Sequence, residues 1–242
     1  MFEEFYDTQT DPDCVNNLIA DPDQQARISE MRQALDAHMI EVNDNGFIPD
    51  GCPIEGYEES RKSGAYPLRR IMDLAALAAK GDAANLLRLR KELSEPNEVV
   101  RYWAAQGLLI LGDKAKDAIP DMQKVVADDE SVHVRIAAAE ALVKLTGDPE
   151  AMKLLIRALD KNPNSRIRLQ ALNALTYVGE KARAALGEIL NAAESDDEYL
   201  RDAGRYLKFV LEGTYTPASP CYDTEWAAGV GARRKMLATA PK

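Results

Sequence analysis

Four arginines recur through the chain at a nearly constant spacing and could act together on an anion. Successive members lie 34, 33 and 33 residues apart: Arg101, Arg135, Arg168 and Arg201. Four aligned guanidinium groups could bind a chain of sulfates or phosphates through their paired N–H donors. Five or six residues before each arginine stands an acidic or amide side chain, in the order Glu95, Asp129, Asn162 and Asp196. Because charges on helices usually pair locally, we favour a structural ladder over an anion site.

The other reactive side chains do not form a catalytic set. The two histidines, His38 and His133, lie about 95 residues apart with no acidic cluster beside either, which favours packing or surface roles. The three cysteines include no CxxC pair, so one disulfide or free thiols remain open for Cys14, Cys52 and Cys221. Motifs of serine hydrolases, P-loop proteins, zinc proteases and dinucleotide-binding folds are absent. We therefore expect no catalytic residue, metal site or cofactor in this chain.

Composition narrows the classes of partner. The 242 residues include 30 Lys and Arg against 40 Asp and Glu, a net charge of −10, so nucleic-acid binding is not expected. No apolar run approaches the ~20 residues that a membrane span needs. The acidic start, MFEEFYDTQT, lacks the apolar core of a signal peptide. Aromatic residues make up only 6% while Ala and Leu are abundant, which favours packed helices over a β-sandwich.

The arginines belong to a longer repeat. Each copy has a β-branched residue or Leu before Arg, then small residues, then a closing Gly. Four blocks follow this pattern: NEVVRYWAAQGLLILG (97–112), SVHVRIAAAEALVKLTG (131–147), NSRIRLQALNALTYVG (164–179) and DEYLRDAGRYLKFVLEG (197–213). A second amphipathic segment, such as PEAMKLLIRAL, lies between successive blocks. Self-similarity at this period predicts an array of stacked helix pairs.

The residue types within a block explain why such pairs would stack. Ala in the first helix lets a neighbour approach closely, Leu and Val fill the layer between pairs, and Gly ends the helix in a left-handed conformation. The pattern V-R-x-x-A-A-x-A-L resembles the HEAT or HEAT-like repeat family over about residues 82–213. In that family, Asp and Arg at these positions tie the inter-repeat turn to the next helix. We predict an all-α fold, a HEAT-like α-solenoid of stacked helix pairs.

The first 50 residues carry a second resemblance. EEFYDTQTDPDCVNNL, at residues 3–18, places an extended Phe-Tyr pair before two turns. It resembles the stretch E-L-Y-D-L-x-x-D-P-x-E-x-x-N-L at the C-terminal end of type I sulfatases. The matching residues are Glu4, Tyr6, Asp7, Asp11, Pro12, Asn17 and Leu18. The later exit NDNGFIPDG is similar as well, while Phe5, Thr8 and Cys14 depart from the family pattern.

This resemblance implies a short strand, a turn and an amphipathic helix that close a sulfatase-like C-terminal subdomain. Sulfatases of this type hydrolyse sulfate esters with a formylglycine nucleophile and a calcium ion. The C/S-x-P-x-R motif that supplies the formylglycine is absent here, since Cys52-Pro53 has its proline at the wrong offset and no arginine follows. The chain would then be the non-catalytic end of a periplasmic or secreted enzyme. Its partners would be an upstream catalytic domain and a sulfated polymer or another protein.

The sequence divides into four expected parts. Residues 1–46 form the sulfatase-like remnant, in which 21–42 predict a helix with an apolar stripe at Ile28, Met31, Leu35, Met39 and Val42. Residues 47–66 are rich in Pro and Gly and form a linker, or an ordered loop that wraps a neighbour. Residues 67–213 form the solenoid. Residues 214–242 form an extended tail that follows the solenoid to about Trp226.

Two other interpretations remain open. The chain could be a stand-alone HEAT-repeat scaffold for protein–protein interaction, with an accidental likeness to sulfatases. Phycobilin lyases also use HEAT-like repeats, but nothing beyond the repeat favours that activity, because a fold does not give a function. The exposure of apolar side chains near the N-terminus distinguishes the sulfatase interpretation from the scaffold interpretation. If Phe5, Tyr6 and the stripe at Ile28, Met31 and Leu35 cannot be covered within this chain, a missing sheet is implied.

Overall fold

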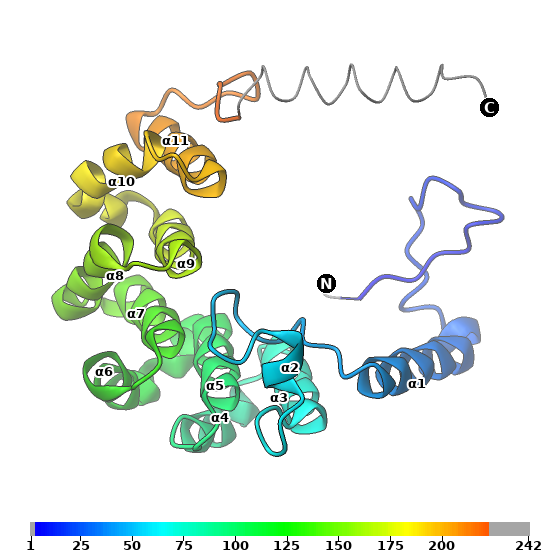
Figure 1. Ribbon diagram of the computed structural model, residues 1–242. Coiled ribbons are helices and arrows are strands. Elements are labelled where there is room, and N and C mark those ends of the chain that lie inside the picture. The colour runs from blue at the N-terminus through cyan, green and yellow to red at the C-terminus, as the bar shows by residue number, and fades with distance from the viewer. Residues whose placement is uncertain (1–2, 223–242) are drawn as a thin grey trace.

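The computed structural model describes residues 3–222, and within them the chain is helical with no strand. The helices follow one another along a curved array (Figure 1). The α-helices are α1 (Gln25–Glu41), α2 (Tyr57–Ser60), α3 (Leu68–Ala79), α4 (Leu86–Glu92), α5 (Glu98–Leu111), α6 (Ile119–Asp128), α7 (Val132–Thr146), α8 (Pro149–Lys161), α9 (Ser165–Tyr177), α10 (Leu186–Ala193) and α11 (Glu198–Glu212). Four 3-10 helices join them: η1 (Pro22–Gln24), η2 (Ala83–Asn85), η3 (Gly112–Ala118) and η4 (Gly179–Ala185).

The repeats build two layers of helices. The helices that carry the four arginines, α5, α7, α9 and α11, line the inner side of the arc, and α4, α6, α8 and α10 lie on the outer side (Figure 1). Each inner helix packs against the next inner helix and against an outer helix. The predicted α-solenoid of stacked helix pairs is therefore confirmed.

Small side chains let the helices approach closely. Alanines of the repeat blocks are completely buried in the inner helices: Ala104, Ala105, Ala138, Ala139 and Ala171. Leucines fill the layer between them, at Leu108, Leu142, Leu172 and Leu175. Burying one such leucine contributes roughly 1.5–3 kcal/mol of transfer free energy. One continuous apolar core therefore runs through all the repeats.

Glycine ends the inner helices as expected. Gly147 follows α7 with φ 70° and Gly213 follows α11 with φ 69°, and both stand in the left-handed conformation. A side chain with a Cβ is strained there, whereas glycine is not. Gly112 and Gly179 also have positive φ, 53° and 65°, although Gly112 has ψ −128° and is not left-handed helical.

The strand expected around Phe5 and Tyr6 is not formed, so this part of the prediction is wrong. The chain curls into a turn instead, in which the Asp11 N–H donates to the Asp7 carbonyl at 2.8 Å. The Leu18 N–H donates to the Phe5 carbonyl at 2.7 Å. A strand needs a ladder of such bonds with a neighbouring strand. Among the described residues, this segment has no strand beside it.

The helix predicted over residues 21–42 is present, but its apolar stripe is largely uncovered. Asp21 caps the preceding turn η1 by accepting the Asp23 N–H at 2.9 Å, and α1 follows. Ile28 is buried, whereas Met31 and Leu35 are 55% and 57% exposed. α1 lies at the end of the arc, and an ion pair between Asp36 and Arg69 of α3, 3.3 Å long, joins it to the solenoid (Figure 1). The described residues therefore leave this helix without an apolar partner along most of its length.

The segments that flank the solenoid are both ordered where the structure describes them. Residues 47–66 include the single turn α2 and bury Ile48, Cys52 and Tyr66. At the other end, residues 214–222 turn back on α11, with the Tyr215 ring 5.0 Å from that of Tyr206. The part of the tail expected to reach Trp226 lies outside the described residues.

Gly204 marks the closest approach of two helices and provides a test of this packing. A Cβ at Gly204 would lie 2.6 Å from the backbone nitrogen of Ala193 at the end of α10, which cannot move aside. We expect Gly204→Ala to lower the free energy of unfolding by about 1–3 kcal/mol, because overpacking forces the two helices apart.

The matched control is Gly187→Ala. Gly187 lies inside α10, and a Cβ there would have no atom within 4 Å. This substitution should raise stability by roughly 0.5–1 kcal/mol, because alanine loses less backbone entropy in a helix. Urea titrations of both variants measure the difference, and a Gly204→Ala protein as stable as the wild type would contradict the packing argument.

Candidate functional site

The arginine ladder is bonded to the scaffold and does not form a row of free cations. Arg101 is the most fully bonded member. Its Nε and Nη2 donate to the two carboxylate oxygens of Asp129, at 2.8 and 3.0 Å, and its Nη1 donates to the carbonyls of Glu95 and Pro96, both at 2.9 Å. The hydrogen bonds to Asp129 raise the pKa of Arg101. Arg101 thus joins its own turn to the turn of the next repeat.

The remaining arginines bond mainly to backbone carbonyls. Arg135 donates from Nε to the Val126 carbonyl and Arg168 from Nε to the Leu159 carbonyl, each at 2.8 Å. Arg201 lies 3.7 Å from Asp202 and 3.4 Å from the Ser195 carbonyl. The predicted partners behave differently from one another: Glu95 pairs with Arg70 at 2.9 Å, Asn162 caps its own turn by accepting the Asn164 N–H, and Asp196 is exposed.

The buried pair of Arg101 and Asp129 should dominate the stability of the ladder. Their side chains are 13% and 6% exposed. Arg101→Gln leaves the Asp129 carboxylate buried and unpaired, so we expect a loss of about 3 kcal/mol in the free energy of unfolding. Arg168→Gln, which removes one bond to a carbonyl, should cost about 1 kcal/mol. Denaturant titration of the two variants tests this order, and equal losses would count against it.

A short segment before the solenoid crosses the inner surface, and we name residues 47–52 the strap. The Trp103 Nε1 donates to the Phe47 carbonyl at 2.9 Å, and the two rings lie 5.9 Å apart. At the other end, the Asn164 Nδ2 donates to the Gly51 carbonyl at 3.1 Å. Gly51 has φ 85°, and a Cβ there would lie within 3.0 Å of the Asn164 and Arg166 side chains. The strap therefore joins α5 to α9 over the inner side of α7 (Figure 1).

A cleft of about 290 Å³ opens where the strap meets the inner helices. Its lining residues come from the strap, α5 and α9: Ile48, Pro49, Asp50, Tyr102, Arg166, Leu169, Gln170 and Asn173. Behind it, the Nδ1 of the buried His133 lies 2.6 Å from the Gln170 Oε1, while the Gln170 Nε2 donates to the His133 carbonyl at 3.2 Å. A tautomer of His133 with its proton on Nδ1 would donate to the Gln170 Oε1. Its Nε2 is buried without a hydrogen-bond partner among the described residues.

Glu140 is a second buried polar group on the same side of α7. It is 8% exposed, and burial raises the pKa of its carboxyl even though Lys144 lies 3.3 Å away. A raised pKa means that ionisation is more costly in the folded state than in the unfolded state. The stability that protonated Glu140 provides is present below its ordinary pKa of 4.5 and is lost as the pH rises through the folded-state value.

Glu140→Gln should therefore stabilise the protein at neutral pH. Gln has the same shape and cannot ionise, so we expect a higher Tm than that of the wild type at pH 7. The difference should vanish near pH 4, where Glu140 is protonated in both states. Calorimetry at the two pH values measures this. Glu180→Gln, which removes a 73% exposed carboxylate paired with Arg183, is the control and should show a much smaller effect.

Beyond the strap, the inner surface is open and rich in tyrosine. Tyr177 at the end of α9 is 68% exposed, Tyr199 at the start of α11 is 58% exposed, and Tyr206 is 37% exposed. Val210, one turn after Tyr206, is 37% exposed as well. We call these four residues the tyrosine face. Tyrosine presents a large contact area at a low cost in conformational entropy, and it is enriched in protein interfaces.

Cations from the neighbouring repeat lie over two of these rings. The Lys144 Nζ lies 5.6 Å from the centre of the Tyr177 ring, and the Arg166 guanidinium lies 4.8 Å from that of Tyr199. In each case the two residues are 33 positions apart, which is the repeat period, so stacking brings them together. Each pair contributes roughly 0.5–1 kcal/mol at an exposed site. The tyrosine face thus combines aromatic area with positive charge.

Sequence reasoning missed both the strap and the tyrosine face. The sequence left open whether residues 47–66 form a linker or an ordered loop that wraps a neighbour. Nothing in the sequence indicated that this loop would contact α9. The tyrosines did carry a signal: Tyr199 and Tyr206 are seven residues apart, which is two helical turns, and Tyr177 stands one repeat before Val210.

The residues shared with the sulfatase motif hold a compact turn. The Asp11 carboxylate accepts the N–H groups of Val15 and Asn16 at 3.1 and 2.7 Å, and the Asn17 Oδ1 accepts those of Phe5 and Ile19 at 3.0 Å each. The Asp7 carboxylate accepts the Gln9 N–H, and these hydrogen bonds lower the pKa of Asp7. Glu4 and Pro12 are exposed, and Tyr6 and Leu18 are partly buried.

The structure resolves the state of the three cysteines. All are free, with Cys14 exposed and Cys52 and Cys221 buried. Burial raises the pKa of the Cys52 thiol to about 12. Since the thiolate is the reactive form, a disulfide-exchange reagent at pH 8 should modify one thiol per chain rapidly, and that thiol should be Cys14. Cys14→Ser should abolish the rapid phase, whereas rapid labelling that persists in this variant would mean that a buried thiol is accessible.

Residues 3–222 contain no group of three or more His, Cys, Asp or Glu side chains placed to hold a metal ion. Over the same residues, no helix is both long and apolar enough to cross a membrane.

Comparisons with known proteins agree with this geometry. Residues 86–176 match the family model of HEAT repeats. Over this range the α-solenoid is similar to HEAT repeats. The chain is also similar to phycocyanobilin lyase subunit alpha of Picosynechococcus sp., with 32% identity over 139 residues. That match covers 53% of this chain and 51% of the relative, so the chain spans about half the length of the curated protein it matches. Neither match concerns a sulfatase.

Proposed function

We propose that this protein is a HEAT-repeat scaffold that binds another protein through its inner surface. The observation that carries the proposal is the tyrosine face, in which Tyr177 and Tyr199 are more than half exposed and stand beside Lys144 and Arg166. Exposed aromatic residues beside cations are typical of interface hot spots. The named relative is one subunit of an enzyme, which supports assembly with a second protein as the role of such repeats.

The charge of the surface favours a particular kind of partner. Lys144 and Arg166 flank the tyrosines; Lys144 also pairs with the buried Glu140 at 3.3 Å, whereas Arg166 has no ion pair among the described residues. A segment that carries both apolar and acidic side chains would contact the rings and pair with the cations. The strap already covers α5 and α7, so the partner would lie on α9 and α11.

Site-specific photo-crosslinking tests this proposal. A benzophenone amino acid at Tyr199 should give a discrete crosslinked species in cells, and the same residue at Leu190, on the outer helix α10, should not. Leu190 is 39% exposed, so both positions are accessible. Replacing Tyr177 and Tyr206 by Ser in the Tyr199 crosslinker protein should reduce the species at least tenfold without lowering Tm. Equal crosslinking from both faces, or none from either, would overturn the proposal.

A second candidate is the non-catalytic end of a sulfatase. One observation favours it: Met31 and Leu35 of α1 remain exposed, as expected if a sheet outside the described residues covers them. The catalytic domain would lie upstream and supply formylglycine and calcium, and a sulfated polymer could contact the solenoid. The parent enzyme would be periplasmic or secreted. The DNA upstream of the Met1 codon tests this, because an in-frame C/S-x-P-x-R motif would support it and a stop codon directly upstream would refute it.

A further inference from the structure

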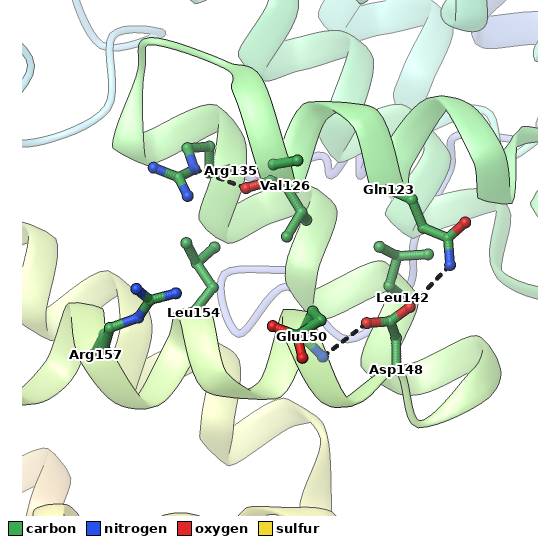
Figure 2. A pocket seen from close by; sticks show the side chains of 9 residues that line it. Gln123, Val126, Arg135, Leu142, Asp148, Glu150, Leu154 and Arg157 are labelled. Carbon is green, nitrogen blue, oxygen red and sulfur yellow. Dashed lines mark hydrogen bonds between the residues drawn. The ribbon is translucent and has the colours of Figure 1, made fainter.

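A groove on the outer side of the solenoid carries two arginines without carboxylate partners. It lies between α6 and α8 and encloses about 420 Å³. Figure 2 shows Arg135 and Arg157 at the same end of the groove, with Leu154 beside them and Asp148 at the opposite end. Val126, Leu142 and Leu154 are buried and form an apolar floor. This volume lies in the range of small-molecule sites, roughly 300–1,000 Å³.

The two guanidinium groups have hydrogen-bonding capacity to spare. Arg135 uses its Nε for the Val126 carbonyl, and neither Arg135 nor Arg157 has an ion pair with any residue from 3 to 222. A guanidinium has five N–H donors, so most donors of both residues remain free. Two such groups at one end of a cleft offer donors to a carboxylate or phosphate placed between them.

A single position in the repeat explains why Arg135 is unpaired. Arg101 is neutralised by Asp129, which belongs to the next repeat. The residue 33 positions after Asp129, where the partner of Arg135 would stand, is Asn162. Asn162 accepts the Asn164 N–H just as Asp129 accepts the Ser131 N–H, but its amide side chain carries no charge that could pair with Arg135. The substitution of an amide for a carboxylate therefore leaves a positive end in this groove.

The carboxylates at the acidic end of the groove already have hydrogen-bond or ion-pair partners. Asp148 accepts the backbone N–H groups of Glu150 and Ala151, both at 3.0 Å, and the Gln123 Nε2 at 2.9 Å. These bonds lower the pKa of Asp148. Glu150 pairs with Lys153 at 2.7 Å. The carboxylates at this end thus have partners, whereas the arginines at the other end do not.

The groove one repeat earlier provides a comparison within the same molecule. It lies between α4 and α6, encloses about 300 Å³ and also contains an arginine, Arg90. There, Arg90 pairs with Asp121 at 2.6 Å, and Asp128 and Asp129 line the same groove. Of these two grooves, only the one between α6 and α8 contains arginines that have no ion pair among residues 3–222.

We infer that this groove binds a small organic carboxylate with an apolar body. The carboxylate would accept hydrogen bonds from Arg135 and Arg157, and the apolar body would lie over Leu142 and Leu154. Arg157 and Glu150 are seven residues apart on α8, so the groove is about 10 Å long. The site is separate from the tyrosine face, which lies on the inner helices (Figures 1 and 2).

Calorimetric titration of the full chain with octanoate tests the inference. We expect saturable binding at one site, and affinity for acetate at least tenfold weaker because acetate lacks the apolar body. Octylammonium, with the opposite charge on the same chain, should not bind. Equal affinity for acetate and octanoate, or binding of octylammonium, would overturn the proposed ligand class.

Arg157→Gln is the decisive variant, since Arg157 is exposed and its loss breaks no bond among the described residues. Octanoate affinity should fall about tenfold, while Arg157→Lys retains part of it. Lys116→Gln removes an exposed cation in η3, outside the groove, and should leave the affinity unchanged. An Arg157→Gln protein that binds octanoate as well as the wild type, or an equal loss in Lys116→Gln, would refute the site. Arg157→Gln should not change the crosslinks formed from Tyr199 on the inner surface. The proposed carboxylate site and the proposed protein-binding surface can therefore be refuted independently.

Discussion

The close approach of neighbouring helices is the constraint on which the rest of the structure depends. At Gly204 the backbone of α11 comes so near to that of α10 that not even a methyl group fits between them. The buried alanines of α5, α7 and α9 permit the same proximity in the earlier repeats. Because every inner helix is held this tightly, the residues on its exposed side occupy fixed positions relative to those on the next helix. A surface of regular geometry follows from small residues in the interior.

That regularity means that residues one repeat apart in the sequence become neighbours in space. Lys144 meets Tyr177, and Arg166 meets Tyr199, each across 33 positions. Because the copies stack in the same register, a single residue that differs between copies changes the contacts at that position. The repeat supplies Asp129 to Arg101, but in the next copy it supplies Asn162. Arg135 therefore bonds to the Val126 carbonyl and has no ion pair among the described residues. Differences between copies, more than the consensus they share, therefore distinguish one face of the solenoid from another.

Much of the fold could be predicted from the sequence because it depends on short-range patterns. The spacing of Arg101, Arg135, Arg168 and Arg201 established the repeat, and the closing glycines marked the ends of inner helices. The predictions that were wrong or missing concern contacts distant in sequence. The strand at Phe5 depended on a neighbour that the described residues do not contain. The bond between Gly51 and Asn164 joins residues 113 positions apart, and no local pattern encodes it. The tyrosine face could have been read from the repeat register, but the exposure of its rings depends on where the strap ends.

The strap also has a mechanical consequence. A solenoid whose repeats contact only their neighbours behaves as a spring, since small rotations between repeats add up along its length. Residues 47–52 bond to α5 at one end and to α9 at the other, and so form a tie across the inner side. Opening the arc would stretch this tie, while the helices beyond α9 have no such restraint among the described residues. Small rotations between repeats should therefore be larger between α9 and α11 than among the strapped helices α5 to α9.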